Sequence, residues 1–193
     1  GLISGNYRWT NPREKSLSVA LVQGAVNQDL KWRPEQLVPT LDLYQKLTEQ
    51  ADGSELIVWP EAAIPALYGQ VTDYLEEIHG KAARQKATVM LGILRDDPEG
   101  GTFQNTLVAL TDPPLFYVKR HLVPFGEYFP VPEFVRNWMR LTSLPYTDAV
   151  AGSDNQLPLE IAGERIAITI CYEDVFGAEQ LGFFDNASLL VNV

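Results

Sequence analysis

Three reactive side chains each follow an apolar segment of the chain directly. Glu61 comes after Leu-Ile-Val-Trp-Pro, Lys119 after Leu-Phe-Tyr-Val, and Cys171 after Ile-Ala-Ile-Thr-Ile. Short apolar runs of this kind are typical of buried strands. The residue after such a strand lies at the rim of the sheet, where α/β proteins assemble their sites. We therefore expect the three residues to lie at strand ends and to form one site.

These three residue types together could carry out acyl transfer. A cysteine attacks as its thiolate, which is scarce at neutral pH because a free thiol has a pKa of about 8.5. A carboxylate can take the thiol proton, and an ammonium group can stabilise both the thiolate and the oxyanion of a tetrahedral intermediate. Each residue alone has a simpler explanation, as a buried core cysteine, a solvated turn glutamate or a surface lysine. Only their combination favours catalysis.

Composition and motifs exclude several other kinds of site. Cys171 is the only cysteine, so the chain forms no internal disulfide and no thiolate zinc cluster. The two histidines, His79 and His121, belong to no H-E-x-x-H motif, and neither a G-x-S-x-G nor a Walker A pattern occurs. The formal net charge of −10 argues against a nucleic-acid partner, because phosphate binding needs a basic surface.

The first half of the chain predicts a sheet covered by helices. Residues 17–22, 56–59 and 88–93 are apolar enough to be buried strands, and apolar residues recur at helical spacing from 37 to 47 and from 71 to 82. An order of strand, helix, strand, helix, strand with continuously apolar strands is typical of such a sheet.

The second half predicts hairpins and mixed strand pairing. Turn sequences at 111–114 and 162–164 separate two pairs of apolar segments, which are 106–110 with 115–118 and 157–161 with 165–170. Between the pairs we expect a loop at 120–130 and a short helix near 132–141. Residues 1–16 are polar and are interpreted as a linker, and residues 17–193 as one domain. Because the chain stops within the strand-like run 188–193, we expect it to be a C-terminally incomplete piece of a longer protein.

Three stretches resemble the apolipoprotein N-acyltransferases, a family within the carbon–nitrogen hydrolase, or nitrilase, superfamily. They are Trp59–Pro65 (WPEAAIP), Lys119–Pro130 (KRHLVPFGEYFP) and Ile170–Glu173 (ICYE). Soluble amidases of the superfamily more often carry Cys-Tyr-Asp followed by Arg-Phe-Pro. The resemblance spans roughly residues 17–193. It implies an α/β fold, a nitrilase-like α-β-β-α sandwich with mixed sheets, as the catalytic domain.

The same resemblance implies roles for particular residues. Cys171 would be the nucleophile, Glu61 the base and Lys119 the oxyanion stabiliser. Supporting residues implied by the family pattern are Asn105, Glu127, Tyr172 and Glu173. Glu127 would orient the lysine and contact the reacting centre, whereas Asn105 could equally be a cap at the entry of a strand. For His121 we expect a packing or hydrogen-bonding role. The resemblance implies no metal and no cofactor.

The implied reaction has two steps. An acyl chain would pass from a phospholipid of the phosphatidylethanolamine type to a cysteine thioester, and then to the N-terminal amine of a diacylglyceryl-cysteine apolipoprotein. The domain would face the periplasm at the bacterial inner membrane, held by membrane segments of a multi-pass protein that this chain lacks. An apolar entrance is expected near residues 125–138, with Phe125, Tyr128, Phe129, Val131, Phe134 and Trp138, unless these side chains only pack the loop.

Two other functions remain open from the sequence. A soluble nitrilase-type amidase would hydrolyse a small amide with the same Glu-Lys-Cys triad. A structural or binding domain that keeps a remnant site is the second alternative.

Overall fold

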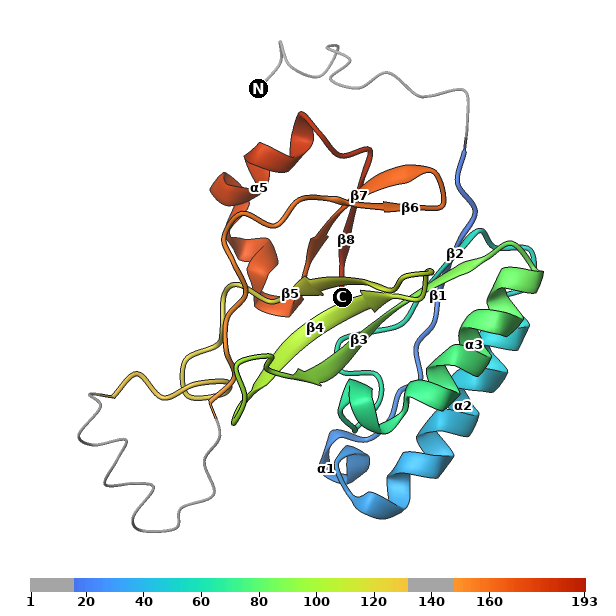
Figure 1. The fold of residues 1–193 in the computed structure, drawn as a ribbon, viewed down its shortest axis with the longest axis horizontal. Helices are drawn as coiled ribbons and strands as arrows, with labels where there is room; N and C mark the ends of the chain where they lie inside the picture. Colours follow the sequence, from blue (N-terminus) through green and yellow to red (C-terminus); the bar gives the residue numbers. More distant parts are fainter. Residues whose placement is uncertain (1–15, 132–147) are drawn as a thin grey trace, which may run out of the picture.

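The computed structural model describes residues 16–131 and 148–193, and these form four layers (Figure 1). The first half contains β1 (Val19–Leu21), α1 (Gln28–Lys31), η2 (Pro34–Gln36), α2 (Leu37–Gln50), β2 (Leu56–Val58), η3 (Tyr68–Gln70), α3 (Thr72–Arg84) and β3 (Thr88–Asp96). The second half contains β4 (Phe103–Ala109), β5 (Leu115–Val118), β6 (Leu159–Ile161), β7 (Glu164–Thr169), η4 (Cys171–Val175), α5 (Gly177–Phe184) and β8 (Leu189–Asn192).

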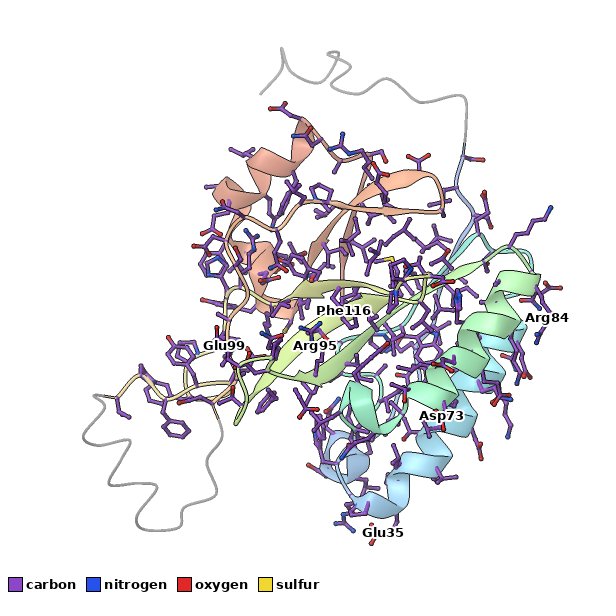
Figure 2. The ribbon with its side chains drawn as sticks, viewed as in Figure 1. Glu35, Asp73, Arg84, Arg95, Glu99 and Phe116 are labelled. Carbon is purple, nitrogen blue, oxygen red and sulfur yellow. The ribbon has the colours of Figure 1, made fainter. Side chains whose placement is uncertain are left out.

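The first sheet has the strand order β1-β2-β3-β4-β5. Strands β1, β2 and β3 are parallel because the chain crosses over through α2 and α3, whereas β3, β4 and β5 pair antiparallel. Helices α2 and α3 lie side by side on one face of this sheet (Figure 1). Charged residues such as Glu35, Asp73 and Arg84 point away from it into solvent, and Arg95 lies over the Phe116 ring at 4.6 Å (Figure 2).

The second sheet has the order β6-β7-β8. A tight turn at Ala162 and Gly163, both with positive φ (52° and 74°), connects β6 to its antiparallel partner β7. Strand β8 pairs parallel with β7, in the register Ile166 with Leu189. Helix α5, which connects these two strands, covers the outer face of the sheet (Figure 1).

Two separate hydrophobic cores hold the layers together. The core between the helices and the first sheet contains Ile57 and Leu91, and the Tyr44 and Trp59 rings stack there with centroids 4.7 Å apart. The core between the two sheets contains Leu56 of β2 packed among residues such as Ile168 of β7. Successive residues of β2 enter opposite cores, so this strand must be apolar at every position.

The predicted α-β-β-α sandwich with mixed sheets is confirmed. Strands β3 and β4 are longer than predicted, because Arg95 and Asp96 pair through their backbones with Gln104 and Phe103 although their side chains are polar. Helices α1 and α5 were not predicted. The helix expected near residues 132–141 lies outside the described residues. Within 16–131 and 148–193, no helix is both long and apolar enough to span a bilayer.

Candidate active site

Glu61 lies in a sharp turn that follows β2 and rests directly on β3. Ala62 has a positive φ of 44° in this turn. The N–H of Ala63 donates to the Gly92 carbonyl at 2.8 Å, and the N–H of Gly92 donates to the Pro60 carbonyl at 3.2 Å. A Cβ atom added to Gly92 would lie 2.5 Å from the Glu61 Cα. Only glycine permits this approach, so Gly92 sets the position of Glu61.

Lys119 lies at the end of β5 and is held on both sides through its backbone. Its N–H donates to the Asn105 carbonyl at 2.8 Å, and its carbonyl accepts from the Gly152 N–H at 2.8 Å. The Gln156 side-chain amide pairs with both backbone groups of Val118, at 2.8 and 2.6 Å, as a neighbouring strand would. With its side chain only 1% exposed, Lys119 is fixed in the interior.

Two carboxylates and two donors form a compact cluster. The Lys119 Nζ lies 3.2 Å from the Glu61 Oε1 and 2.9 Å from the Glu127 Oε1. The Asn105 Nδ2 donates to the same two oxygens, at 2.7 and 2.9 Å. The second oxygen of Glu127 accepts from the Val123 N–H at 2.8 Å. Four residues predicted for the site therefore lie together. Asn105 is the third residue of β4 and its amide bridges two carboxylates, so the alternative of a strand-entry cap is wrong.

The cluster keeps the Lys119 ammonium protonated. Burial acts to lower the pKa of Lys119 and is the largest single influence, but the hydrogen bonds and charges of Glu127 and Glu61 together outweigh it. The net result is a pKa above the ordinary lysine value. An ammonium group fixed at this point is suited to stabilise an anion that forms next to it.

Cys171 approaches this cluster from the second sheet. Cys171 follows β7 and Ile170 in the chain. It has a positive φ of 52°, and its N–H donates to the Val193 carbonyl at 2.6 Å. This left-handed conformation is uncommon for a residue other than glycine and is found preferentially at functional sites. Cys171 is an exposed residue although its thiol is partly buried.

The surroundings raise the pKa of the Cys171 thiol. Partial burial is the largest cause, the charge of Glu61 and a hydrogen bond with its carboxylate add to it, and the Lys119 charge and the Tyr172 N–H oppose it. The sulfur therefore rests as a thiol beside a carboxylate that can accept its proton. This arrangement favours proton transfer to Glu61 during attack over a thiolate formed in advance.

Glu173 and Tyr172, which follow the nucleophile, differ in their surroundings. Glu173 is 1% exposed, and its carboxylate accepts from the Tyr117 hydroxyl and from backbone N–H groups rather than from Lys119. Tyr172 is 42% exposed and its ring meets the Phe176 ring edge-on at 5.2 Å. Glu173 thus holds neighbouring backbone in place from a buried position, and Tyr172 lies at the surface beside the cysteine.

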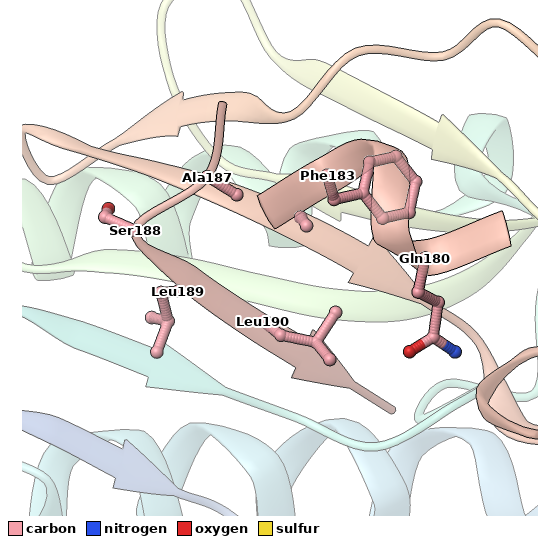
Figure 3. Close-up of a pocket in the computed structure, with 7 residues that line it drawn as sticks. Gln180, Phe183, Ala187, Ser188, Leu189 and Leu190 are labelled. Atoms are coloured by element: carbon pink, nitrogen blue, oxygen red, sulfur yellow. The ribbon is translucent and has the colours of Figure 1, made fainter. Parts of the chain in front are cut away.

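A groove of about 450 Å³ opens beside Tyr172, the residue that follows Cys171. Its lining residues include Leu122, Pro124, Tyr128, Ala151, Tyr172 and Phe176. His121 also borders the groove: its ring stacks on Phe176 at 4.0 Å and its Nε2 lies 2.6 Å from the Glu179 Oε2, which agrees with a packing and hydrogen-bonding role. A smaller recess of about 100 Å³ lies between α5 and β8 (Figure 3). The linings of the groove and of the recess do not include Glu61, Lys119 or Cys171.

Three residues near the site were missed by the sequence analysis. Gly92 interrupts an apolar strand, and a glycine there is a sign of close backbone approach that could have been used. Lys31 of α1 is buried, which lowers its pKa, and the charge of Glu61 acts in the opposite direction. Tyr117 looks like an ordinary strand residue in the sequence.

In residues 16–131 and 148–193, no group of three or more histidine, cysteine or acidic side chains is arranged to hold a metal ion.

Two curated relatives match almost the whole chain, and both are named apolipoprotein N-acyltransferase. The protein of Methylococcus capsulatus is 39% identical over 187 residues, and that of Nitrosomonas europaea is 37% identical over 187 residues. Each match covers 96% of this chain but only 37% of the relative. The chain therefore spans well under half the length of these proteins.

The fold and the family follow from two further similarities. An amidase structure from Nesterenkonia sp. superposes with a TM-score of 0.60 at 20% identity, covering 98% of this chain and 67% of the amidase, which is a likeness of fold. Residues 18–181 match the family described as carbon-nitrogen hydrolase. This match includes Glu61, Lys119 and Cys171 and covers most of the chain. The chain belongs to the carbon-nitrogen hydrolase family.

Proposed function

We propose that this chain is the catalytic domain of an apolipoprotein N-acyltransferase. The observation that carries the proposal is the identity of 37 to 39% across almost the whole chain with relatives of that name. The arrangement of a nucleophile, a base and a buried ammonium supports it, since acyl transfer needs these three groups.

In the first step, the Cys171 sulfur attacks the ester carbonyl carbon at the sn-1 position of a phospholipid. Glu61 takes the thiol proton as the new bond between sulfur and carbon forms. The Lys119 ammonium stabilises the negative charge that develops on the carbonyl oxygen. When this intermediate collapses, the bond from carbon to the glycerol oxygen breaks, and that oxygen leaves with the proton from Glu61. The products are a thioester on Cys171 and a lysophospholipid.

In the second step, the α-amine of the diacylglyceryl-cysteine at an apolipoprotein N-terminus attacks the thioester carbonyl. Glu61 now takes a proton from the amine and returns it to the sulfur as the bond between carbon and sulfur breaks. Lys119 again stabilises the oxyanion. Glu127 and Asn105 keep Glu61 and Lys119 at fixed positions through the hydrogen bonds of the cluster, so that both steps use one geometry.

The groove beside Tyr172 is where we place the lipid chains. Its volume of about 450 Å³ falls within the range of roughly 300–1,000 Å³ that is usual for small-molecule sites. Phe125, which follows Pro124 of the groove lining, is 69% exposed and meets Phe129 edge-on at 6.0 Å. An exposed phenylalanine at this point favours the apolar entrance expected for residues 125–138 over simple loop packing. Phe134 and Trp138 lie outside the described residues.

The alternative is an amidase that uses the same three residues with water as the acceptor, and the fold likeness to the Nesterenkonia amidase is compatible with it. The two functions differ in the second step. In an acyltransferase the thioester should persist in buffer and react with an amine that binding holds in place. Of the two functions, only the acyltransferase implies a location at the outer face of the bacterial inner membrane.

A chase experiment separates the two functions. The whole protein, purified in the form in which its host makes it, is loaded with phosphatidylethanolamine labelled in the sn-1 chain. The label is then followed with and without a diacylated lipopeptide, and with the same lipopeptide acetylated at its α-amine as the matched control. We expect rapid transfer only to the lipopeptide with a free amine. Rapid release of labelled fatty acid, equal under all three conditions, would show a hydrolase.

A further inference from the structure

The candidate catalytic residues come from two different sheets. Glu61 follows β2 and Lys119 follows β5 of the first sheet, whereas Cys171 follows β7 of the second. Contacts between sheets are made mostly by apolar side chains, which pack without strong directional preference. Directional bonds between the end of β5 and the end of β7 are therefore needed to hold the sulfur at a defined distance from the ammonium.

The Glu173 carboxylate makes bonds of this kind. Its Oε1 accepts from the N–H groups of Arg120 and His121, at 2.6 and 3.2 Å. Its Oε2 accepts from the N–H of Ile170 at 2.8 Å. Arg120 and His121 follow the lysine, and Ile170 precedes the cysteine. One buried carboxylate thus connects the backbone beside Lys119 to the backbone beside Cys171.

The charge of this carboxylate is connected to a cation through a single phenol. The Tyr117 hydroxyl donates to the Glu173 Oε2 at 3.0 Å and accepts from the Arg120 Nε at 3.0 Å. Tyr117 is 2% exposed. Within the described parts of the chain, no cationic side chain lies at ion-pair distance from Glu173. A buried carboxylate needs hydrogen-bond donors and a compensating charge, and Tyr117 connects it to both.

The Arg120 guanidinium also contacts other parts of the second half of the domain. Its Nη1 donates to the Asp154 carbonyl at 3.2 Å, and it lies 5.4 Å from the centre of the Phe183 ring. Phe183 and Gln180 both project from α5 (Figure 3). The Gln180 amide donates to the Glu173 carbonyl at 3.1 Å. The bonds through Tyr117 therefore extend from the lysine-bearing strand to the helix that covers the second sheet.

We propose that Tyr117 is a positioning residue whose hydroxyl, by linking Arg120 to Glu173, sets the position of Cys171 relative to Glu61 and Lys119. The proposal rests on the proposed roles of those three residues. It predicts that loss of the hydroxyl lets the two strand ends separate. Burial and, after it, the Glu61 charge raise the pKa of the Cys171 thiol. Separation would remove the contribution of Glu61, together with the weaker opposing influence of Lys119.

The test compares Tyr117→Phe with Tyr74→Phe in the whole protein. Tyr74 is the matched control, because its hydroxyl also donates a hydrogen bond away from solvent, to the Leu41 carbonyl at 2.8 Å, but between α2 and α3. Each variant is labelled with iodoacetamide across the neutral and alkaline range, well below its melting temperature. Acyl-enzyme formation from phosphatidylethanolamine is measured in parallel by intact mass.

We expect both variants to lose thermal stability, but only Tyr117→Phe to change the chemistry of the thiol. Its labelling at neutral pH should become faster, by roughly threefold or more, because its pKa moves back toward the ordinary thiol value. Its acylation should become slower by about tenfold or more, because small displacements in a site are costly. If the labelling profile of Tyr117→Phe matches that of wild type and Tyr74→Phe, Tyr117 is only structural and the proposal is wrong.

The choice of assay and a second variant keep the test decisive. Labelling needs no phospholipid, so a wild-type protein that forms no acyl-enzyme would contradict the proposed function without affecting the result on Tyr117. If Tyr117→Phe does not fold, Arg120→Lys replaces it, since lysine keeps the charge but cannot reproduce the Nε donor of arginine. The expected change in labelling has the same direction, and an unchanged profile would overturn the proposal.

Discussion

Replacing Gly92 by alanine should displace Glu61, the proposed base, and leave its carboxylate chemically unchanged. The added Cβ would lie 2.5 Å from the Glu61 Cα, 2.6 Å from the Ala62 nitrogen and 2.7 Å from the Pro60 oxygen. All three are backbone atoms, so no side chain can rotate away. Ordinary contacts begin at 3.4 Å, so the turn and β3 must separate by about 0.9 Å.

The cost of this displacement can be divided between stability and rate. Overpacking of a well-packed site typically costs about 1–3 kcal/mol, and replacing a glycine inside a strand by alanine returns about 0.5–1 kcal/mol. Gly92→Ala should therefore fold. A catalytic group must be held within about 0.5 Å of its productive position, and a 1 Å error can cost about 10²-fold in rate. We expect acylation of Cys171 to slow by about that factor.

The assay is the rate of acyl-enzyme formation from phosphatidylethanolamine, followed by intact mass, alongside thermal unfolding. Gly80→Ala is the matched control, because a Cβ at that position in α3 would meet only the end of the Arg84 side chain, at 4.0 Å. It should keep the wild-type rate and gain about 0.5–1 kcal/mol of stability. A Gly92→Ala protein that acylates at more than about half the wild-type rate would refute the reasoning, since it would show that Glu61 tolerates a displacement beyond the ~0.5 Å limit.

Three substitutions test the charged groups directly. Cys171→Ser should form no acyl adduct by mass, because a carboxylate activates an alcohol poorly; an adduct at the wild-type level would contradict the nucleophile assignment. Glu61→Gln should slow acylation by about 10²-fold or more and yet speed iodoacetamide labelling at neutral pH, because the Glu61 charge contributes, after burial, to the raised pKa of the thiol; slower labelling would contradict this electrostatic picture. Lys119→Arg keeps the charge but not the compact ammonium geometry, so most acylation should be lost while thermal unfolding stays cooperative; full activity would show that charge alone suffices.

Local sequence was sufficient for much of the fold and for the reactive residues. Strand β2 is apolar at every position because both of its faces are buried, and the buried run from Ile166 to Ile170 is apolar except for Thr169. These runs are enough to show that Glu61 and Cys171 each follow a buried strand. The continuous apolar runs predict a sheet covered by helices, and the hairpin turns predict mixed strand pairing; the arrangement of two sheets in a sandwich came from the family resemblance. Residues that lie next to a strand end in the sequence also lie next to it in space, so these predictions need no tertiary information.

The contacts that fix the site could not be read from the sequence, because they join residues far apart in the chain. Asn105 reaches Glu61 across 44 positions, and Tyr117 reaches Glu173 across 56. A buried tyrosine in a strand has the same local pattern whether its hydroxyl meets a carboxylate or a carbonyl. Its partner is decided only when the two sheets pack face to face, since that packing determines which buried polar groups must satisfy one another.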